Sequence, residues 1–143
     1  MERFNIYLAG SMTWLSLDEQ MEWRIELENV IKYDYAHEYN MKPMFFNPVK
    51  RYNMINPSHI SEREPFDFDL YNLRKSDLVV VNFNKPDSLG TAMELAIAHE
   101  LRIPVIALNE NGAELHPWLE CCCTRIFNTM DEIIVHIQDF YLT

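Results

Sequence analysis

The stretch Leu78-Val79-Val80-Val81-Asn82-Phe83 is the strongest strand signal in the sequence and decides the fold class. An uninterrupted run of apolar and β-branched residues is typical of a parallel strand that is buried on both faces. A polar loop follows over residues 84–89, and Gly90-Thr91 then begins a helix that continues to about Leu101. This strand, loop and helix predict one unit of an alternating α/β fold.

Strands and helices are predicted to alternate in both directions from this unit. Two helices begin with a capping box, in which a Ser or Thr is followed three residues later by Glu: Ser16 with Glu19, and Thr129 with Glu132. The further strands are predicted at residues 4–8, 43–46, 105–108 and 125–127, and the helices at 16–35, 64–76, 90–101 and 129–141.

The first helix shows which face it is expected to bury. Its apolar positions lie mostly on one side, which we expect to pack on the sheet. They are Leu17, Met21, Ile25, Leu27, Val30 and Ile31.

The alternating order predicts a parallel sheet with helices on both faces. We expect a doubly wound α/β fold with a flavodoxin-like five-stranded sheet in the order 2-1-3-4-5, and a related doubly wound order is the alternative. The 143 residues suffice for one hydrophobic core and are too few for two ordinary ones, so we expect a single domain over residues 1–143.

Composition excludes several classes of function. Twelve Lys and Arg against 22 Asp and Glu give a net charge of −10, which disfavours binding to a nucleic-acid polymer. No apolar run is long enough to span a membrane, and no basic and apolar leader precedes Phe4, so we expect neither a membrane partner nor a signal peptide. The sequence has no G-x-x-x-x-G-K-[ST] and no G-x-G-x-x-G motif, which disfavours NTPase and dinucleotide-binding functions.

The three cysteines are consecutive, Cys121 to Cys123. Adjacent cysteines do not easily meet disulfide geometry, so we expect a reduced, cytoplasmic protein in which they are small buried packing residues. This spacing is not a zinc pattern, even with His116 nearby, so we expect no metal.

The predicted topology brings three loops together. In an open α/β sheet, ligands bind beyond the carboxyl ends of the strands, at the point where the strand order reverses. The loops at that edge cover residues 9–15, 47–61 and 84–90. A connection as long as 47–61 is often functional in a small domain. This sheet edge is therefore the predicted site.

Glu94 is the main catalytic candidate at this edge. It lies about one turn into a helix that has almost no polar surface before His99, so we expect that helix to be well buried. A carboxylate in such a helix costs free energy unless it is paired or used. The alternative is an ordinary exposed glutamate that the N-terminus of the helix stabilises.

Three other residues near this edge have two interpretations. Asp67 and Asp69 point to different faces of their helix, so one of them can face the site; the alternative is two solvated carboxylates. Tyr7 ends the first strand and is either a site residue or a packing residue.

Together these residues resemble the nucleoside 2-deoxyribosyltransferase family, in order from about Asn5 to Ile106. The core of the resemblance is the Gly-Thr-Ala-x-Glu-Leu segment, which is moderately specific. The matching pieces are Tyr7-Leu8-Ala9-Gly10, Asn47-Pro48, Asp69-Leu70, and Ser88-Leu89-Gly90-Thr91-Ala92-Met93-Glu94-Leu95 with Ala98 a turn later.

The resemblance implies a catalytic mechanism that needs no cofactor. Glu94 would attack the anomeric carbon of a 2′-deoxynucleoside, and the covalent deoxyribosyl intermediate would pass its sugar to a second base. Tyr7 would orient Glu94, and Asp69 would give a proton to the leaving base. The implied substrate-binding residues are Gly10, Ser11, Asn47, Asp87, Ser88 and Gly90.

Two departures keep alternatives open. The transferases commonly carry an Asp six residues before the nucleophile, where this chain has Ser88. That Ser, with Gly10-Ser11, resembles a related branch, the 2′-deoxynucleoside 5′-monophosphate N-hydrolases, in which serines bind the phosphate. That branch also uses an Arg where this chain has Thr13. A non-catalytic nucleotide-binding sensor is a further alternative.

The resemblance also implies a homo-oligomer, a dimer or a hexamer, whose active sites are shared between subunits. The stretch 114–118 is expected near Glu94 of a neighbouring subunit. Its apolar side chains, with Leu119, are the kind that mark an interface.

Overall fold

The deciding stretch forms β3 (Leu78–Asn82), whose five residues are all buried. The computed structural model describes residues 1–12, 14–51 and 61–143. β3 lies in a five-stranded sheet of order β2-β1-β3-β4-β5 in which every neighbouring pair is parallel, so the predicted flavodoxin-like order is confirmed. The other strands are β1 (Arg3–Gly10), β2 (Lys42–Phe46), β4 (Val105–Leu108) and β5 (Arg125–Phe127).

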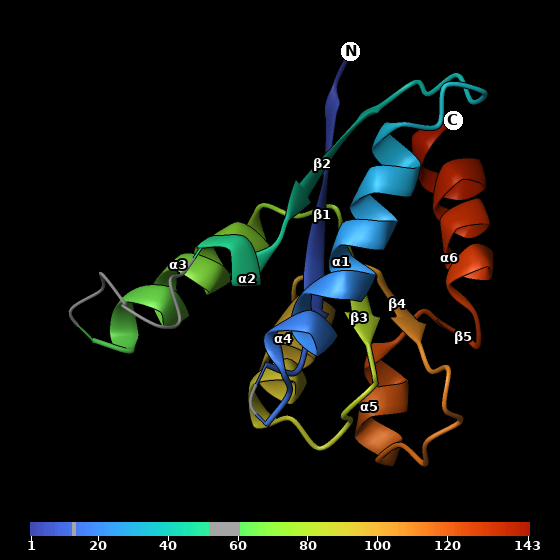
Figure 1. The fold of residues 1–143 in the computed structure, drawn as a ribbon. Coiled ribbons are helices and arrows are strands. Elements are labelled where there is room, and N and C mark those ends of the chain that lie inside the picture. The colour runs from blue at the N-terminus through green and yellow to red at the C-terminus, as the bar shows by residue number, and fades with distance from the viewer. Residues whose placement is uncertain (13, 52–60) are drawn as a thin grey trace.

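The helices connect these strands and cover both faces of the sheet (Figure 1). They are α1 (Leu17–Lys32), α2 (Pro48–Arg51), α3 (Arg63–Arg74), α4 (Leu89–Glu100), α5 (Pro117–Cys122) and α6 (Met130–Ile137), which continues as a π-helix η1 (Gln138–Leu142). Both predicted capping boxes begin their helices: the hydroxyl of Ser16 accepts from the Glu19 N–H, and that of Thr129 accepts from the Glu132 N–H.

The side chains of the strands belong to two separate hydrophobic cores, one on each face of the sheet, because successive residues of a strand point to opposite faces. On one face, Leu78 and Val80 of β3 pack with α1 and α6. On the other face, Val79 and Val81 pack with α3, α4 and α5. The sheet is therefore the middle of three layers, and α3 projects from the body of the protein (Figure 1).

The predicted buried face of α1 is partly wrong. Leu17 and Val30 are 58% and 43% exposed. The buried residues are Gln20, Trp23, Arg24, Leu27, Glu28 and Ile31. Polar side chains occupy this face because they find partners inside the protein: Gln20 donates to the carbonyl groups of Met12 and Leu15.

Several boundaries differ from the predictions. The first helix ends at Lys32 rather than near Tyr35. The predicted loop at 47–61 begins with α2, and its residues 52–60 lie outside the described part of the chain. α5 was not predicted, because a helix of only six residues is too short to show a helical period in the sequence.

The position of α5, at the end of which the cysteines lie, determines how exposed each of them is. Cys122 and Cys123 are partly buried and pack against the core that contains β3, but Cys121 is exposed, so the expectation of three buried packing residues is wrong for that position. All three are free thiols.

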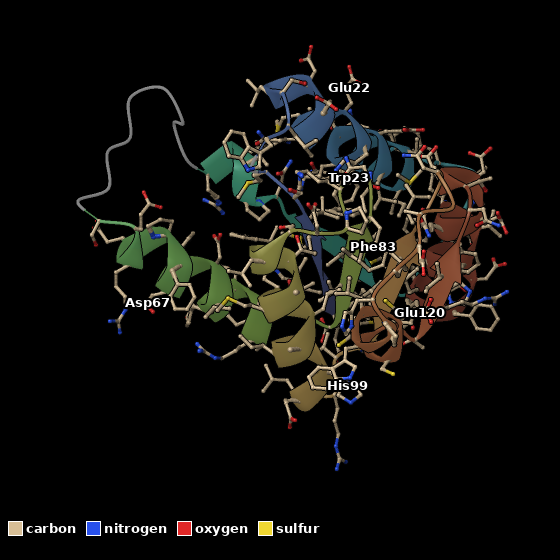
Figure 2. All side chains as sticks on the ribbon, turned by 90° about the horizontal axis from the view of Figure 1, so that it is seen from below. Glu22, Trp23, Asp67, Phe83, His99 and Glu120 are labelled. Atoms are coloured by element: carbon tan, nitrogen blue, oxygen red, sulfur yellow. The ribbon has the colours of Figure 1, made fainter. Side chains whose placement is uncertain are left out.

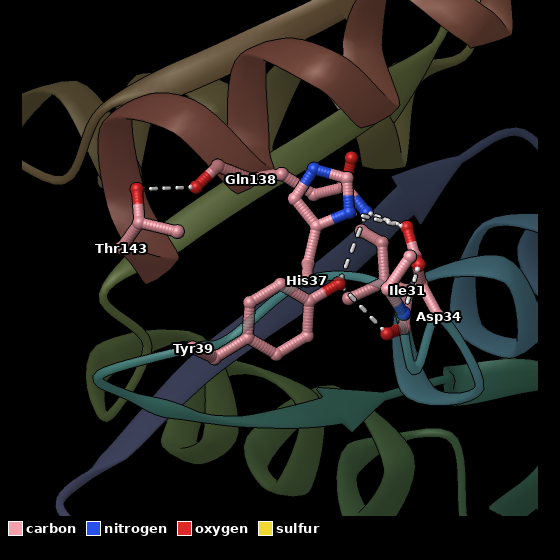
Figure 3. A network of polar contacts seen from close by, with 7 residues as sticks. Ile31, Asp34, His37, Tyr39, Gln138 and Thr143 are labelled. Carbon is pink, nitrogen blue, oxygen red and sulfur yellow. Dashed lines mark hydrogen bonds and ion pairs between the residues drawn. The ribbon is translucent and has the colours of Figure 1, made fainter.

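A polar network joins the C-terminal segment to the end of α1 (Figure 3). Asp34 accepts one hydrogen bond from the Gln138 amide at 2.8 Å and contacts His37 Nδ1 at 2.7 Å. Gln138 also donates to the Tyr39 hydroxyl, which in turn donates to the Ile31 carbonyl. The hydrogen bond from Gln138 is the main reason that the pKa of Asp34 lies below its usual value.

None of the described helices combines the length and the apolar character that a bilayer crossing requires.

The observed face of α1 makes a stability prediction. Leu27 is fully buried between α1 and the sheet, so Leu27→Ala should lower the free energy of unfolding by about 2–5 kcal/mol. Leu17→Ala, at an exposed position of the same helix, is the matched control and should change it by less than about 0.5 kcal/mol. Urea unfolding measures both variants, and equal losses would contradict the observed face.

Candidate active site

The carboxyl ends of β1 and β3 and the first turns of α4 form the site. Ser88 is the N-cap of α4, and its hydroxyl accepts a hydrogen bond from the Thr91 N–H at 3.3 Å. This cap fixes where the helix begins and so places Glu94 beside the end of β1.

Gly10 lets the backbone pass closely over α1. Its φ is +153°, and a Cβ at this position would lie 3.1 Å from the Trp23 ring and 3.3 Å from an Arg24 nitrogen. Glycine is the residue that tolerates both the conformation and the close approach.

Two adjoining pockets open at this edge. The first, of about 170 Å³, is mostly apolar, and the second, of about 350 Å³, is more polar. Both are lined by Gly10, Met12, Gly90 and Glu94, so Glu94 lies where they meet. The first is also lined by Leu8, Ala9, Arg24, Pro48, Phe66, Asp69, Leu70 and Met93, and the second by Ser11, Trp14, Lys85, Asp87, Ser88, Leu89 and Thr91.

A direct hydrogen bond joins Tyr7 to Glu94. The Tyr7 hydroxyl donates to Glu94 Oε2, and the Tyr7 side chain is completely buried. Its ring stacks on Phe46 with centroids 5.3 Å apart, and Phe46 in turn meets the edge of Phe68. This packing fixes the tyrosine, so the bond holds the carboxylate in one orientation.

The pKa of Glu94 is raised to about 7, mainly by burial and in addition by the charge of Asp69. The hydrogen bond from Tyr7 and the charge of Arg24 act in the opposite direction and favour the ionised form. Burial, followed by the charge of Glu94, also raises the pKa of Tyr7 far above its usual value, so the phenol stays a donor. Glu94 therefore changes charge near neutral pH, which suits a catalytic group.

The structure separates the two aspartates of α3. Asp69 lines the first pocket with Glu94, whereas Asp67 is exposed and pairs with Arg63 at 2.8 Å. Asp67 lies on the part of α3 that projects from the body of the protein (Figure 2). Of the two carboxylates that the sequence left open, Asp69 is thus the one placed at the candidate site.

The other predicted site residues fall into two groups. Ser11, Ser88 and Asp87 line the second pocket; Ser11 is buried, and Asp87 is exposed and pairs with Lys85 at 3.1 Å. Asn47 lines neither of the two pockets that the described part of the chain forms. Its side chain instead accepts from the Val49 N–H at 3.1 Å and so caps α2. Thr13 lies outside the described residues.

The stretch 114–118 does not reach the pockets of its own chain as described. Leu115 is buried beneath α5, and His116 Nδ1 accepts from the Trp118 N–H at 3.1 Å. Trp118 itself is 79% exposed.

Sequence reasoning missed two charged residues of the site, Lys85 in the second pocket and Arg24 in the first. The Arg24 side chain is 1% exposed, yet it lines the first pocket. The signal was its spacing, because Arg24 lies three and seven residues before Leu27 and Ile31, on the face that α1 buries. The predicted burial of α4 is also only half right, since Leu89 and Met93 are exposed on its outer side.

Within the described ranges, no three His, Cys, Asp or Glu side chains are grouped so that they could hold a metal ion.

Comparisons with known proteins establish the fold. No family model and no curated protein matches the chain. Among solved structures, a conserved protein from Enterococcus faecalis has 18% identity and a TM-score of 0.72, covering 94% of this chain and 97% of that one.

Two further similar structures are enzymes by description. A 2-deoxyribosyltransferase from Bacillus psychrosaccharolyticus has 19% identity and a TM-score of 0.68, over 91% of this chain and 90% of its own. A CMP N-glycosidase from Clostridium botulinum has 20% identity and a TM-score of 0.56, over 93% and 96%. At these identities the likeness shows that the chain has the flavodoxin-like fold of these proteins.

The raised pKa of Glu94 makes stability depend on pH. Below about pH 4.5 the Glu94 carboxyl is neutral in both the folded and the unfolded chain. Between about pH 4.5 and 7 it ionises in the unfolded chain but stays largely neutral in the folded one, so the free energy of unfolding falls as pH rises through this range. Glu94→Gln removes this loss, so the variant should exceed the wild type by about 1–3 kcal/mol at pH 8 and by much less at pH 5.

Urea unfolding at both pH values measures the difference. Glu100→Gln, on the exposed side of the same helix, is the control and should show no such pH-dependent gain. A Glu94→Gln gain that is equal at pH 5 and pH 8 would contradict a desolvated carboxyl.

Proposed function

We propose that this chain is a nucleoside 2-deoxyribosyltransferase that acts, over residues 1–143, as one domain. It would cleave the N-glycosidic bond of 2′-deoxynucleosides and transfer the sugar to another base. The observation that carries the proposal is the Tyr7–Glu94 hydrogen bond at the junction of the two pockets, with Asp69 in the same pocket. A fixed nucleophilic carboxylate and a second carboxyl are what retaining glycosidic chemistry requires.

The reaction would proceed in two displacements. The two carboxyl groups share one proton, and the reactive form carries it on Asp69. Ionised Glu94 then attacks C1′ of the deoxyribose, the C1′–N bond breaks with its electrons going to the base, and Asp69 gives its proton to that base. In the second step a nitrogen of the incoming base attacks C1′, the bond from C1′ to the Glu94 oxygen breaks, and Asp69 takes the incoming proton. Sugar and protons balance over the cycle, and the enzyme is regenerated.

Tyr7 would assist without giving up its proton. Its hydrogen bond fixes Glu94 and favours the ionised form, and its own raised pKa keeps the hydroxyl protonated. When the carboxylate becomes an ester in the intermediate, the same hydroxyl remains a donor to the departing oxygen.

The comparisons support this class of chemistry. Two proteins of similar fold are described as a 2-deoxyribosyltransferase and a CMP N-glycosidase, and both names refer to nucleosides or nucleotides. The residues that the family resemblance implied, Tyr7, Asp69 and Glu94, line or contact one pocket in this chain.

The second pocket favours one alternative, hydrolysis of 2′-deoxynucleoside 5′-monophosphates. Ser11 and Ser88 line it beside the first turn of α4, where backbone N–H groups attract an anion. Water would then replace the incoming base in the second displacement. A non-catalytic sensor is the weaker candidate, because recognition alone does not require a desolvated carboxylate beside the sugar.

Assembly and location are part of the same proposal. We infer a homo-oligomer, a dimer or a hexamer, in which the stretch 114–118 of one subunit approaches Glu94 of another. The exposed side chains Trp14, Leu89, Met93 and Trp118 supply apolar surface for such contacts. The three free cysteines fit the reducing cytoplasm.

The function is tested by product analysis. The protein is incubated with deoxyadenosine or its monophosphate, with and without free cytosine. We expect deoxycytidine, or its monophosphate, when cytosine is present; free sugar alone would indicate the hydrolase. Glu94→Gln should lower either rate by about 10³-fold or more, as loss of a nucleophile does. A wild-type protein that leaves every deoxynucleoside and monophosphate intact would overturn the proposal.

The two aspartates of α3 provide a matched pair for the proton donor. Asp69→Asn should lower kcat by about 10²-fold or more, because amides do not donate a proton to the leaving base. Asp67→Asn, two residues away on the exposed side, should stay within about twofold of wild type. Similar rates for both variants would exclude Asp69 as the donor.

The serines of the second pocket distinguish phosphorylated from free substrates. If the substrate carries a 5′-phosphate, Ser11→Ala and Ser88→Ala should each weaken monophosphate binding by ~1–2 kcal/mol, the range for hydrogen bonds to charged groups. Binding of unphosphorylated nucleosides should change much less. Calorimetric titration of both substrate types measures this, and equal losses for the two would rule out a phosphate role.

A further inference from the structure

Arg24 is a buried cation to which the proposed reaction gives no role. It lies in the middle of α1, and its side chain is 1% exposed between that helix and the sheet. Arginine stays charged in proteins, so this position carries a permanent positive charge inside the protein. Such a charge is costly to bury unless its surroundings compensate it.

The hydrogen-bond partners of Arg24 are neutral. Nε donates to the Leu8 carbonyl at 3.2 Å, Nη2 to the Gly10 carbonyl at 3.2 Å, and Nη1 to the Gln20 carbonyl. The guanidinium also lies 4.6 Å from the centroid of the Trp23 ring. These bonds engage three of its five N–H donors, and no ion pair of Arg24 occurs among the residues that the structure describes.

Glu94 is the carboxylate whose charge Arg24 is placed to balance. Both side chains line the first pocket, Arg24 from α1 and Glu94 from α4. Of the described residues, the other charged or titratable groups that face Glu94 are Tyr7 from β1 and Asp69 from α3. Lys85, in the adjoining pocket, is already paired with Asp87. Arg24 is thus a cation without an ion pair among the described residues, and its charge favours the ionised form of Glu94, whereas the charge of Asp69 disfavours it.

We propose that Arg24 is a positioning residue of this site: its charge keeps Glu94 ionised for attack, and its hydrogen bonds hold the carbonyl groups of Leu8 and Gly10, two residues that line the first pocket. The catalytic half of this inference rests on the proposed function; the coupling of Arg24 to Glu94 does not. The direction of the Arg24 effect on the pKa of Glu94, which is downward, agrees with it.

The coupling is measured without substrate. Protein labelled with ¹³C at the glutamate side chains is titrated by NMR, and the Glu94 signal is assigned as the one missing from Glu94→Gln. In Arg24→Met the Glu94 midpoint should rise by about 0.5–1 pH unit, because a nearby opposite charge has been removed. Arg24→Lys keeps the charge and should leave the midpoint within about 0.2 units.

A matched control removes a different positive charge. Arg63→Met takes away an exposed arginine of α3 that pairs with Asp67, and should also leave the midpoint within about 0.2 units because water and salt screen exposed charges. A folded Arg24→Met protein with an unmoved midpoint would overturn the inference. So would an equal shift in Arg63→Met.

Kinetics separate positioning from a merely structural role. In Arg24→Met the acid limb of the kcat/KM profile should move upward with the NMR midpoint. In Arg24→Lys that limb should stay in place while kcat falls about tenfold, because an ammonium does not reproduce the hydrogen bonds of the guanidinium.

If circular dichroism shows that Arg24→Met does not fold, Arg24→Lys decides: a midpoint shifted by more than about 0.5 units, or an unchanged kcat, overturns the inference. A wild-type protein inert toward all deoxynucleosides and their monophosphates refutes the proposed function and the catalytic half with it, whereas an unmoved NMR midpoint overturns this inference and leaves the proposed function standing.

Discussion

The parallel pairing of β1 with β3 is the constraint on which the rest of the structure depends. Its register sets Gly10 opposite Asn82, so both strands end at the same edge of the sheet. Because β3 is buried on both faces, helices must cover each side, and the chain crosses over by α1 and α4 at this edge. The carboxylate of α4, the tyrosine of β1 and the arginine of α1 meet there as a result of that pairing.

Much of the fold and the principal carboxylate could be predicted from local pattern. The run from Leu78 to Val81 is apolar without a break, which is typical of a strand buried on both faces of a parallel sheet. Gly90-Thr91 marked the start of α4, and the apolar residues around Glu94 marked the unusual position of its carboxylate. These signals lie within one helical turn or one strand of the residues they describe, so the sequence carries them directly.

Other features depend on tertiary contacts that no local pattern contains. Asp67 and Asp69 have similar neighbours in sequence, and only the docking of α3 on the sheet turns one inward. Arg24 is hidden from hydropathy because its burial depends on carbonyl groups of β1, sixteen and fourteen residues earlier. Leu17 and Cys121 are the opposite case: they were expected to be buried and are exposed. An apolar or thiol side chain does not reveal in the sequence whether another element covers it.

The outer side of α4 links the charge at the site to its surroundings. Leu89 and Met93 are 76% and 44% exposed and flank the opening above Glu94. A second copy of the chain that covered these two side chains would expel water from the pocket mouth and lower the local dielectric, which disfavours the ionised carboxylate. The acidity of this one group would then report whether α4 is covered, and the pH at which the site becomes competent would depend on protein concentration.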